Sequence, residues 1–211
     1  MSSSTVIFIG SPERNLKNSA HKNIKNLFFV SPNDVASRIF GSFVPPVSKK
    51  YQKVYIDLLG PILGFLILTA FLNYGFSYKV VQISYSPTES MCAFGFLMPL
   101  LCFLLSKIGG SNVTPFEIVS LVGYSLYGHI FTLLASYICF QERSNFFFFV
   151  CLIFFGGLST LRLALVFLFT IPIPAARLLI CTVISLANIL YLIFLHFAYM
   201  HRTFMYKDES L

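Results

Sequence analysis

The fold is decided by an uncharged stretch, LLGPILGFLILTAFLNYGF, at residues 58–76. A helix needs about 20 mostly apolar residues to cross the hydrocarbon core of a bilayer, which is about 30 Å thick. This stretch has that length and contains no Asp, Glu, Lys, Arg or His. Pro61 falls in its first turn, where a missing N–H removes no helical hydrogen bond. The stretch therefore predicts a transmembrane helix.

Four more stretches of this kind follow along the chain. They cover residues 88–106, 118–140, 146–170 and 178–200. Polar loops at 77–87 and 107–117, a tight turn at 141–145 and a Pro-containing connector at 171–177 separate them. The sequence thus predicts an all-α polytopic membrane protein, with a five-transmembrane-helix bundle over residues 56–202.

The composition agrees with a membrane class and excludes others. Of 211 residues, 56% are hydrophobic and 11% are charged, and the mean hydropathy is +0.78. A soluble domain carries about 25% charged residues, so a cytosolic enzyme or a disordered chain is not expected. The 5 cysteines lie in apolar stretches, are odd in number and show no metal-ligand spacing. We expect them to be reduced and buried.

The basic residues gather before the first span and predict the orientation. The net charge is +7, and eight of the 15 Lys and Arg are Arg14, Lys17, Lys22, Lys25, Arg38, Lys49, Lys50 and Lys53. The positive-inside rule then places the N-terminus in the cytosol, and five spans place the C-terminus in the lumen. Residues 1–55 show no sustained helical or strand period and are predicted to be a largely disordered, basic cytosolic tail. Residues 203–211 would form a short lumenal tail.

The basic tail is expected to meet membrane lipid rather than nucleic acid. A nucleic-acid interface would interleave basic residues with exposed aromatic side chains or show a known module, and neither pattern is visible. An anionic cytosolic leaflet attracts a basic segment without further features.

Ser125 and His129 in the third stretch lie four positions apart on one helix face, a spacing that could suit an intramembrane serine protease. Leu126, not glycine, follows Ser125, and the other candidate base, His196, is expected too far along its own helix. No catalytic residue is therefore predicted. His129, His196 and His201 have no carboxylates nearby in the sequence, so neither a metal site nor a cofactor is predicted.

Arg162 is the cation that must lie inside a span, about eight residues, or 12 Å of helix rise, from the cytosolic end of the fourth stretch. A guanidinium facing lipid there costs a few kcal/mol. Asp57 and Glu117 begin helices on the same side. We predict that Arg162 faces inward and forms an ion pair with Asp57 or Glu117; the alternative is snorkelling to the headgroups.

Small residues mark two helix faces that allow close backbone contact. Gly123 with Gly128 forms one, and Gly156-Gly157 with Ser159 forms the other. We expect a partner protein beside at least one of them.

Three sets of motifs point to one known family. The first is Asp57-Leu58-Leu59-Gly60-Pro61, and the second is the Gly123-Tyr124 element within residues 121–129. The third joins Gly156-Gly157-Leu158-Ser159-Thr160-Leu161-Arg162 with segments 176–181 and 195–199. In this order they resemble the Yip-domain proteins, and the third set resembles the member-three branch. The resemblance covers about residues 51–202, and its motif residues are Asp57, Gly60, Pro61, Gly123, Tyr124, Gly128, Gly156, Gly157, Arg162, Arg177, His196 and Tyr199.

The resemblance implies a non-catalytic membrane protein of the Golgi, at its cis side or in the ER–Golgi intermediate. It implies assembly with a sister Yip-family protein, contact with Rab GTPases on the cytosolic side, and support of Golgi organisation and vesicle-mediated transport. The alternative from another class is a small channel or transporter, for which His129, Asn188 and Arg162 are the main polar residues in the spans. A membrane-shaping protein without a fixed partner is a third possibility.

Overall fold

The computed structural model of the chain describes residues 6–8, 30–45, 53–77, 85–139 and 145–201. Within them, five helical segments are long and apolar enough to cross a membrane, as predicted. They are α3 (Leu59–Ser77), α4 (Pro87–Ile108), α5 (Pro115–Ile138), the continuous series α6 (Phe146–Cys151), η1 (Leu152–Gly157) and α7 (Leu158–Thr170), and α8 (Pro174–Leu195) with η2 (His196–Met200). Both η elements are π-helical. The five-helix bundle is therefore confirmed.

Several helices begin earlier than their hydropathy indicated. α4 and α5 each start at a proline that follows a capping residue, Ser86 or Thr114. In both, a glutamate three positions later completes a capping box, which satisfies N–H groups that the first turn leaves unpaired. α8 starts at Pro174, so residues 174–177 are helical and the predicted connector is corrected to 171–173. Proline suits the first turn because its fixed φ is helical.

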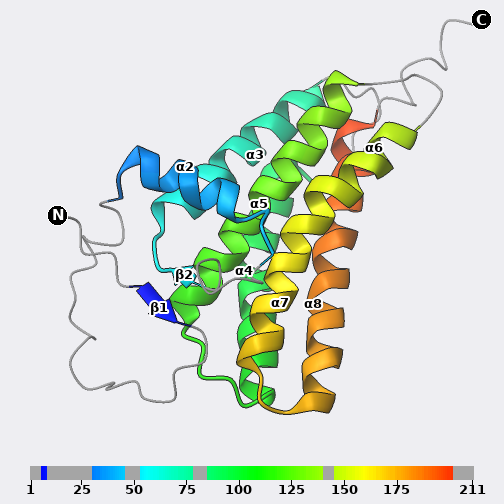
Figure 1. Ribbon diagram of the computed structural model, residues 1–211. Coiled ribbons are helices and arrows are strands. Elements are labelled where there is room, and N and C mark those ends of the chain that lie inside the picture. The colour runs from blue at the N-terminus through cyan, green and yellow to red at the C-terminus, as the bar shows by residue number, and fades with distance from the viewer. Residues whose placement is uncertain (1–5, 9–29, 46–52, 78–84, 140–144, 202–211) are drawn as a thin grey trace, which may run out of the picture.

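α5 is the central helix of the bundle. Inside the molecule, 78% of its spanning window is buried, against 28% for α3 and for α4. It packs against α3, α4, α6, η1 and α7, and Figure 1 shows it running between α3 on one side and the α6–α7 series on the other. Residues without bulky side chains, such as Gly123 and Gly128, occur along it, so that neighbouring backbones can come close.

Part of the predicted tail is folded. α2 (Pro32–Gly41) contacts α3 and α5, and Figure 1 shows it lying across them. Two short strands, β1 (Val6–Phe8) and β2 (Lys53–Tyr55), pair antiparallel. The prediction of a segment without regular structure is wrong for these residues. α2 is short, so its stability comes from docking onto the bundle, where Val35 is buried and Ile39 packs against the core. The rest of residues 1–55, and residues 203–211, lie outside the described part.

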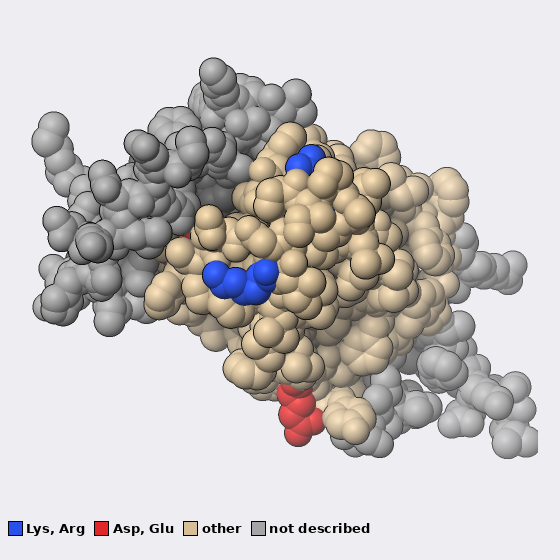
Figure 2. Space-filling model, turned by 90° about the horizontal axis from the view of Figure 1, so that it is seen from below, with Lys and Arg blue, Asp and Glu red and all other residues tan. Residues whose placement is uncertain are grey.

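The outer helices present apolar side chains to their surroundings. Leu66 of α3, Phe96 of α4 and Leu178 of α8 are all more than half exposed. In the view of Figure 2, Lys, Arg, Asp and Glu occupy small separated areas among other residues. All 5 cysteines are free, as predicted, but Cys92 and Cys139 are exposed, so the prediction that every cysteine is buried is corrected for these two. Cys92 lies on an exposed face of α4, and Cys139 follows the last residue of α5.

Candidate functional site

Asp57, just before α3, is fully buried and links three helices. One carboxylate oxygen accepts a hydrogen bond from the N–H of Gly60 (3.1 Å), which caps the start of α3. The Tyr124 hydroxyl of α5 donates to Oδ2 (2.9 Å) and lies 3.1 Å from Oδ1. Arg38 of α2 forms an ion pair with Oδ2. A buried carboxylate is tolerated when it is paired and hydrogen-bonded in this way, so Asp57 holds α2, α3 and α5 together.

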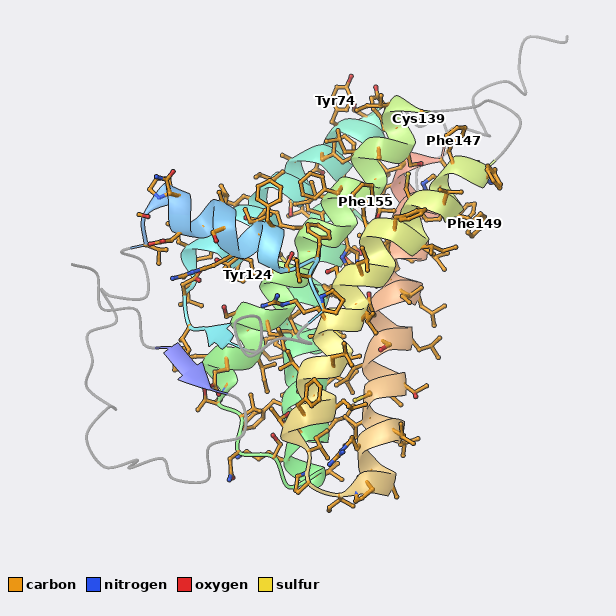
Figure 3. The ribbon with its side chains drawn as sticks, viewed as in Figure 1. Tyr74, Tyr124, Cys139, Phe147, Phe149 and Phe155 are labelled. Atoms are coloured by element: carbon orange, nitrogen blue, oxygen red, sulfur yellow. The ribbon has the colours of Figure 1, made fainter. Side chains whose placement is uncertain are left out.

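The glycines beside Asp57 allow α3 and α5 to touch. A Cβ atom on Gly60 would lie 2.5 Å from Cζ of Tyr124, and one on Gly123 would lie 2.8 Å from Cα of Pro61. The Tyr127 hydroxyl donates to the Gly60 carbonyl oxygen (2.9 Å). The first two motifs thus pack on each other. We call Arg38, Asp57, Gly60, Pro61, Gly123 and Tyr124 the joint. Figure 3 shows Tyr124 on the side of α5 that faces α2.

Arg162 faces inward but does not use the predicted partners. From α7, its Nη1 donates to the carbonyl oxygens of Gly41 and Val44, the latter at 3.2 Å. Gly41 ends α2, where carbonyl groups lack helical donors and favour a cation. Arg162 and Arg38 therefore both fasten the last turn of α2 to the bundle.

The ion pair predicted between Arg162 and Asp57 or Glu117 is therefore corrected. Among the described residues, Arg38 is the cation paired with Asp57. Glu117 accepts hydrogen bonds from the N–H (2.7 Å) and hydroxyl (2.9 Å) of Thr114 at the start of α5. The sequence prediction lacked α2, which supplies both the guanidinium for Asp57 and the carbonyl groups for Arg162.

The predicted small-residue faces are mostly filled by this chain itself. A Cβ atom on Gly128 would lie 2.8 Å from Ser159 Oγ, and one on Gly156 would lie 2.6 Å from Leu192 Cδ2. The Ser159 hydroxyl also donates to the Ser125 carbonyl oxygen (3.0 Å). Gly157 differs, because a Cβ there would meet only the Leu152 carbonyl oxygen, at 3.5 Å. Of the predicted glycines, Gly157 leaves room for another chain.

A chain of buried polar groups runs from α5 to α7 and α8. The Ser125 hydroxyl donates to the Val122 carbonyl oxygen (2.7 Å) and not to His129. The His129 ring nitrogens lie 3.2 Å and 3.3 Å from the carbonyl oxygens of Ser125 and Asn188. Asn188 Nδ2 donates to Thr160 Oγ1 (2.7 Å). These contacts join helices and do not assemble a nucleophile with a base.

The remaining motif residues lie along α8 and η2, away from the joint. Arg177 Nε donates to the Ile171 carbonyl oxygen (3.0 Å), which fastens the turn before α8. The His196 ring stacks on Phe148 with centroids 3.7 Å apart. Tyr199 is fully buried, with its hydroxyl 3.4 Å from the Tyr85 carbonyl oxygen. Over the described ranges, no three His, Cys, Asp or Glu side chains form a group that could hold a metal ion.

Sequence reasoning missed Arg38, Tyr127 and the helix that carries Arg38. One local signal was present: Ser31 precedes Pro32 and accepts a hydrogen bond from the N–H of Asp34 (3.2 Å), which is a standard helix start. Nothing local indicated that this helix docks on the bundle.

Comparison with known proteins agrees with the motif assignment. No solved structure matches the chain. The family model described as the YIPF3 C-terminal domain matches residues 32–200. This segment runs from the first residue of α2 to the last residue of η2, and so includes residues that the sequence analysis assigned to the tail. With most of its length covered by one family model, the chain belongs to the YIPF3 C-terminal domain family, the member-three branch of the Yip-domain proteins.

Proposed function

We propose that this chain is a non-catalytic Golgi membrane protein that assembles with a sister Yip-family protein and supports Golgi organisation and vesicle-mediated transport. One observation carries the non-catalytic part. The motif residues Asp57, Gly60, Gly123 and Tyr124 are used up in contacts between helices, where they hold the bundle together. A buried side chain that is already bonded to or packed against a neighbouring helix is not available for chemistry on a substrate.

Family membership supports the cellular part of the proposal. From it we infer residence in the cis-Golgi or the ER–Golgi intermediate, and contact with Rab GTPases on the cytosolic side. The basic residues before the first span support a cytosolic N-terminus and, with five spans, a lumenal C-terminus.

We place the sister protein on the outer face of η1 and α7, around Gly157. Ile153 and Phe154 are 67% and 62% exposed, and Leu161 is 44% exposed. Gly157 lies between these large side chains and has open space in front of it. A small residue among large ones lets a second helix come close in a membrane, where packing rather than the hydrophobic effect drives association. π-helical turns such as η1 are frequent at functional sites.

Two neighbouring glycines provide a matched test. Gly157→Leu should lower crosslinking and co-purification of the sister protein from native membranes while leaving the level of this chain unchanged. Gly156→Leu should instead lower the level of the chain itself, because the new side chain meets Leu192. An unchanged partner list for Gly157→Leu would contradict the proposed interface.

The channel alternative is separated from this proposal by an ion-flux assay on the purified chain in liposomes. The His129–Asn188–Thr160 contacts are the polar route that it would use. We expect no flux above that of empty liposomes, and flux abolished by His129→Ala would favour the alternative instead.

A further inference from the structure

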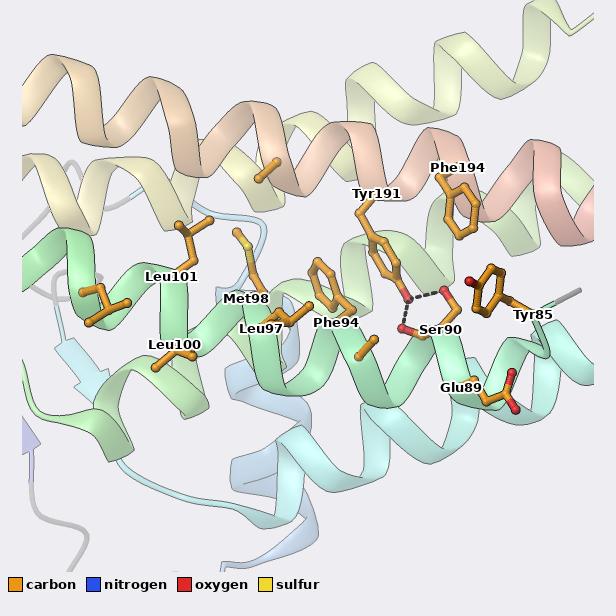
Figure 4. A pocket seen from close by; sticks show the side chains of 13 residues that line it. Tyr85, Glu89, Ser90, Phe94, Leu97, Met98, Leu100, Leu101, Tyr191 and Phe194 are labelled. Carbon is orange, nitrogen blue, oxygen red and sulfur yellow. Dashed lines mark hydrogen bonds between the residues drawn. The ribbon is translucent and has the colours of Figure 1, made fainter.

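A groove lies along α4 and α8 on the side of the bundle away from the joint, and the rings of Phe94 and Tyr191 stack between the two helices with centroids 3.8 Å apart. The volume of the groove is about 1070 Å³. Ala93 and Ala187 are among its small lining residues, and Leu97, Leu100 and Leu104 form part of its apolar wall. These three leucines are 58%, 40% and 51% exposed, so the groove is open to the surroundings of the bundle. Figure 4 shows Phe94, Met98 and Tyr191 between the two helices.

One end of the groove is polar. The Tyr191 hydroxyl donates to the Ser90 carbonyl oxygen (3.2 Å) and lies 3.4 Å from Ser90 Oγ, so these groups satisfy each other. Glu89 is exposed beside them and is the charged residue among those that line the groove. Figure 4 places Tyr85 and Phe194 at this same end.

The groove must be filled when the protein lies in a bilayer, because an apolar wall without contacts loses dispersion energy and water is not stable there. From Glu89 to Leu104 the helix rises about 22 Å, which exceeds the roughly 15 Å of one leaflet's hydrocarbon. An acyl chain fits such a length. A second helix fits less well, because the leucines at the rim would keep its backbone away.

We propose that this groove binds a zwitterionic phospholipid, with an acyl chain between α4 and α8 and the cationic headgroup at Glu89. The carboxylate complements an ammonium group, and Tyr85 and Phe194 supply aromatic faces that attract one. Among the described residues that line the groove, Glu89 is the charged one, so this lining favours a cationic group over an anionic one. The site is separate from the proposed partner face and does not depend on it.

The test uses the full chain in nanodiscs that contain phosphatidylcholine with a photoactivatable acyl chain. Mass spectrometry should find adducts concentrated in residues 85–104 and 187–194 rather than on the exposed face of α3. Excess phosphatidylcholine should compete with the probe roughly fivefold better than excess phosphatidylglycerol, as for a single charge contact at a wet boundary.

Two variants and one control sharpen the result. Glu89→Gln removes the charge but can keep the capping box of α4, so it should abolish the headgroup preference without unfolding the helix. Ala93→Phe should fill the groove and remove the adducts, whereas Leu66→Phe on the exposed face of α3 should not.

Adducts spread evenly over all lipid-facing helices would overturn the site. A preference for phosphatidylcholine that survives Glu89→Gln would overturn the role of Glu89. Loss of the groove adducts when the sister protein is co-expressed would show that a helix occupies the groove in the assembly, which also overturns the proposal.

Discussion

The joint and the groove represent two different ways of packing helices in one bundle. At the joint, α3 and α5 approach so closely that Gly60 and Gly123 have no room for a Cβ atom, and a fully buried carboxylate is completely paired. At the groove, α4 and α8 meet through the stacked rings of Phe94 and Tyr191 and leave an open apolar space beside that contact. The family's first two motifs therefore form an internal contact between α3 and α5. The groove, in contrast, is a surface that we propose lipid covers.

The largest expected effect is the presence or absence of a glycan. It reports the side of the membrane on which each of the two regions lies. The joint begins α3, and the polar end of the groove begins α4, so consecutive helices place them on opposite sides. Asn112 of the sequon Asn112-Val113-Thr114 is exposed before α5, on the side of the joint. We expect it to carry no glycan, because we propose that this side is cytosolic.

Glycosidase-sensitive mobility shifts check this orientation. As a positive control, Asp208→Asn completes a sequon with Glu209 and Ser210 in the predicted lumenal tail, and it should be glycosylated. A glycan on Asn112 would reverse the orientation and move the groove's polar end to the cytosol.

Removing the carboxylate of the joint should have the largest effect on stability. Asp57→Ala removes the buried carboxylate that forms the ion pair with Arg38, and breaking a buried pair costs about 3–5 kcal/mol in the free energy of unfolding. Thermal unfolding in detergent measures it. Asp34→Asn, an exposed acidic residue of α2, serves as the matched control and should change stability by less than about 1 kcal/mol.

A double variant separates charge burial from packing. Arg38→Met combined with Asp57→Ala should be more stable than Asp57→Ala alone, because it also removes the buried positive charge that Asp57 balances. If the effects of the two changes simply add, the ion pair is not what the joint depends on.

The glycine pair at positions 123 and 157 sharpens the contrast between tight and open packing. Gly123→Ala forces a methyl group against the Pro61 backbone and should cost about 1–3 kcal/mol. Gly157→Ala meets no crowding and should be neutral or stabilise the helix by up to about 1 kcal/mol. Equal losses in unfolding temperature for both variants would contradict the difference in packing.

The smallest difference between paired variants is expected for two tyrosine hydroxyls. Tyr124→Phe removes a donor to a buried carboxylate and should cost about 1.5–3 kcal/mol. Tyr191→Phe removes a donor to the Ser90 carbonyl oxygen beside the groove and should cost about 0.5–1.5 kcal/mol. The same detergent unfolding assay ranks them, and the reverse order would place the more important polar contact at the groove.

The bundle was predictable because each span can be recognised from its own residues. A run such as residues 58–76 is long and uncharged, and no partner is needed to recognise it. The helix starts at Ser86 and Thr114 were also legible, since each is followed by proline and then by a glutamate that completes the cap. The loop predicted at 107–117 nevertheless includes Thr114 and Glu117, because hydropathy alone counts a capping glutamate as a polar interruption.

The ion pair was predicted with the wrong cation for a different reason. Arg162 lies within a span and Asp57 at the start of one. When the five spans are considered without the N-terminal segment, each is an available partner for the other. α2 has ten residues, and the apolar face that packs on the bundle consists of Val35 and Ile39, a pattern too short to predict docking from the sequence. Once docked, it supplies Arg38 to Asp57 and carbonyl groups to Arg162.

By itself the sequence determined the membrane class, the five spans and the family, because hydrophobic length and motif order are properties of the chain. Only the tertiary structure decided that α5 is the central helix, that Gly157 rather than Gly156 faces outward, and which arginine neutralises Asp57. Helices in a bilayer are apolar on every side. Hydropathy therefore identifies a span without identifying its neighbours, and the neighbours are selected by close packing and by the pairing of a few buried polar groups.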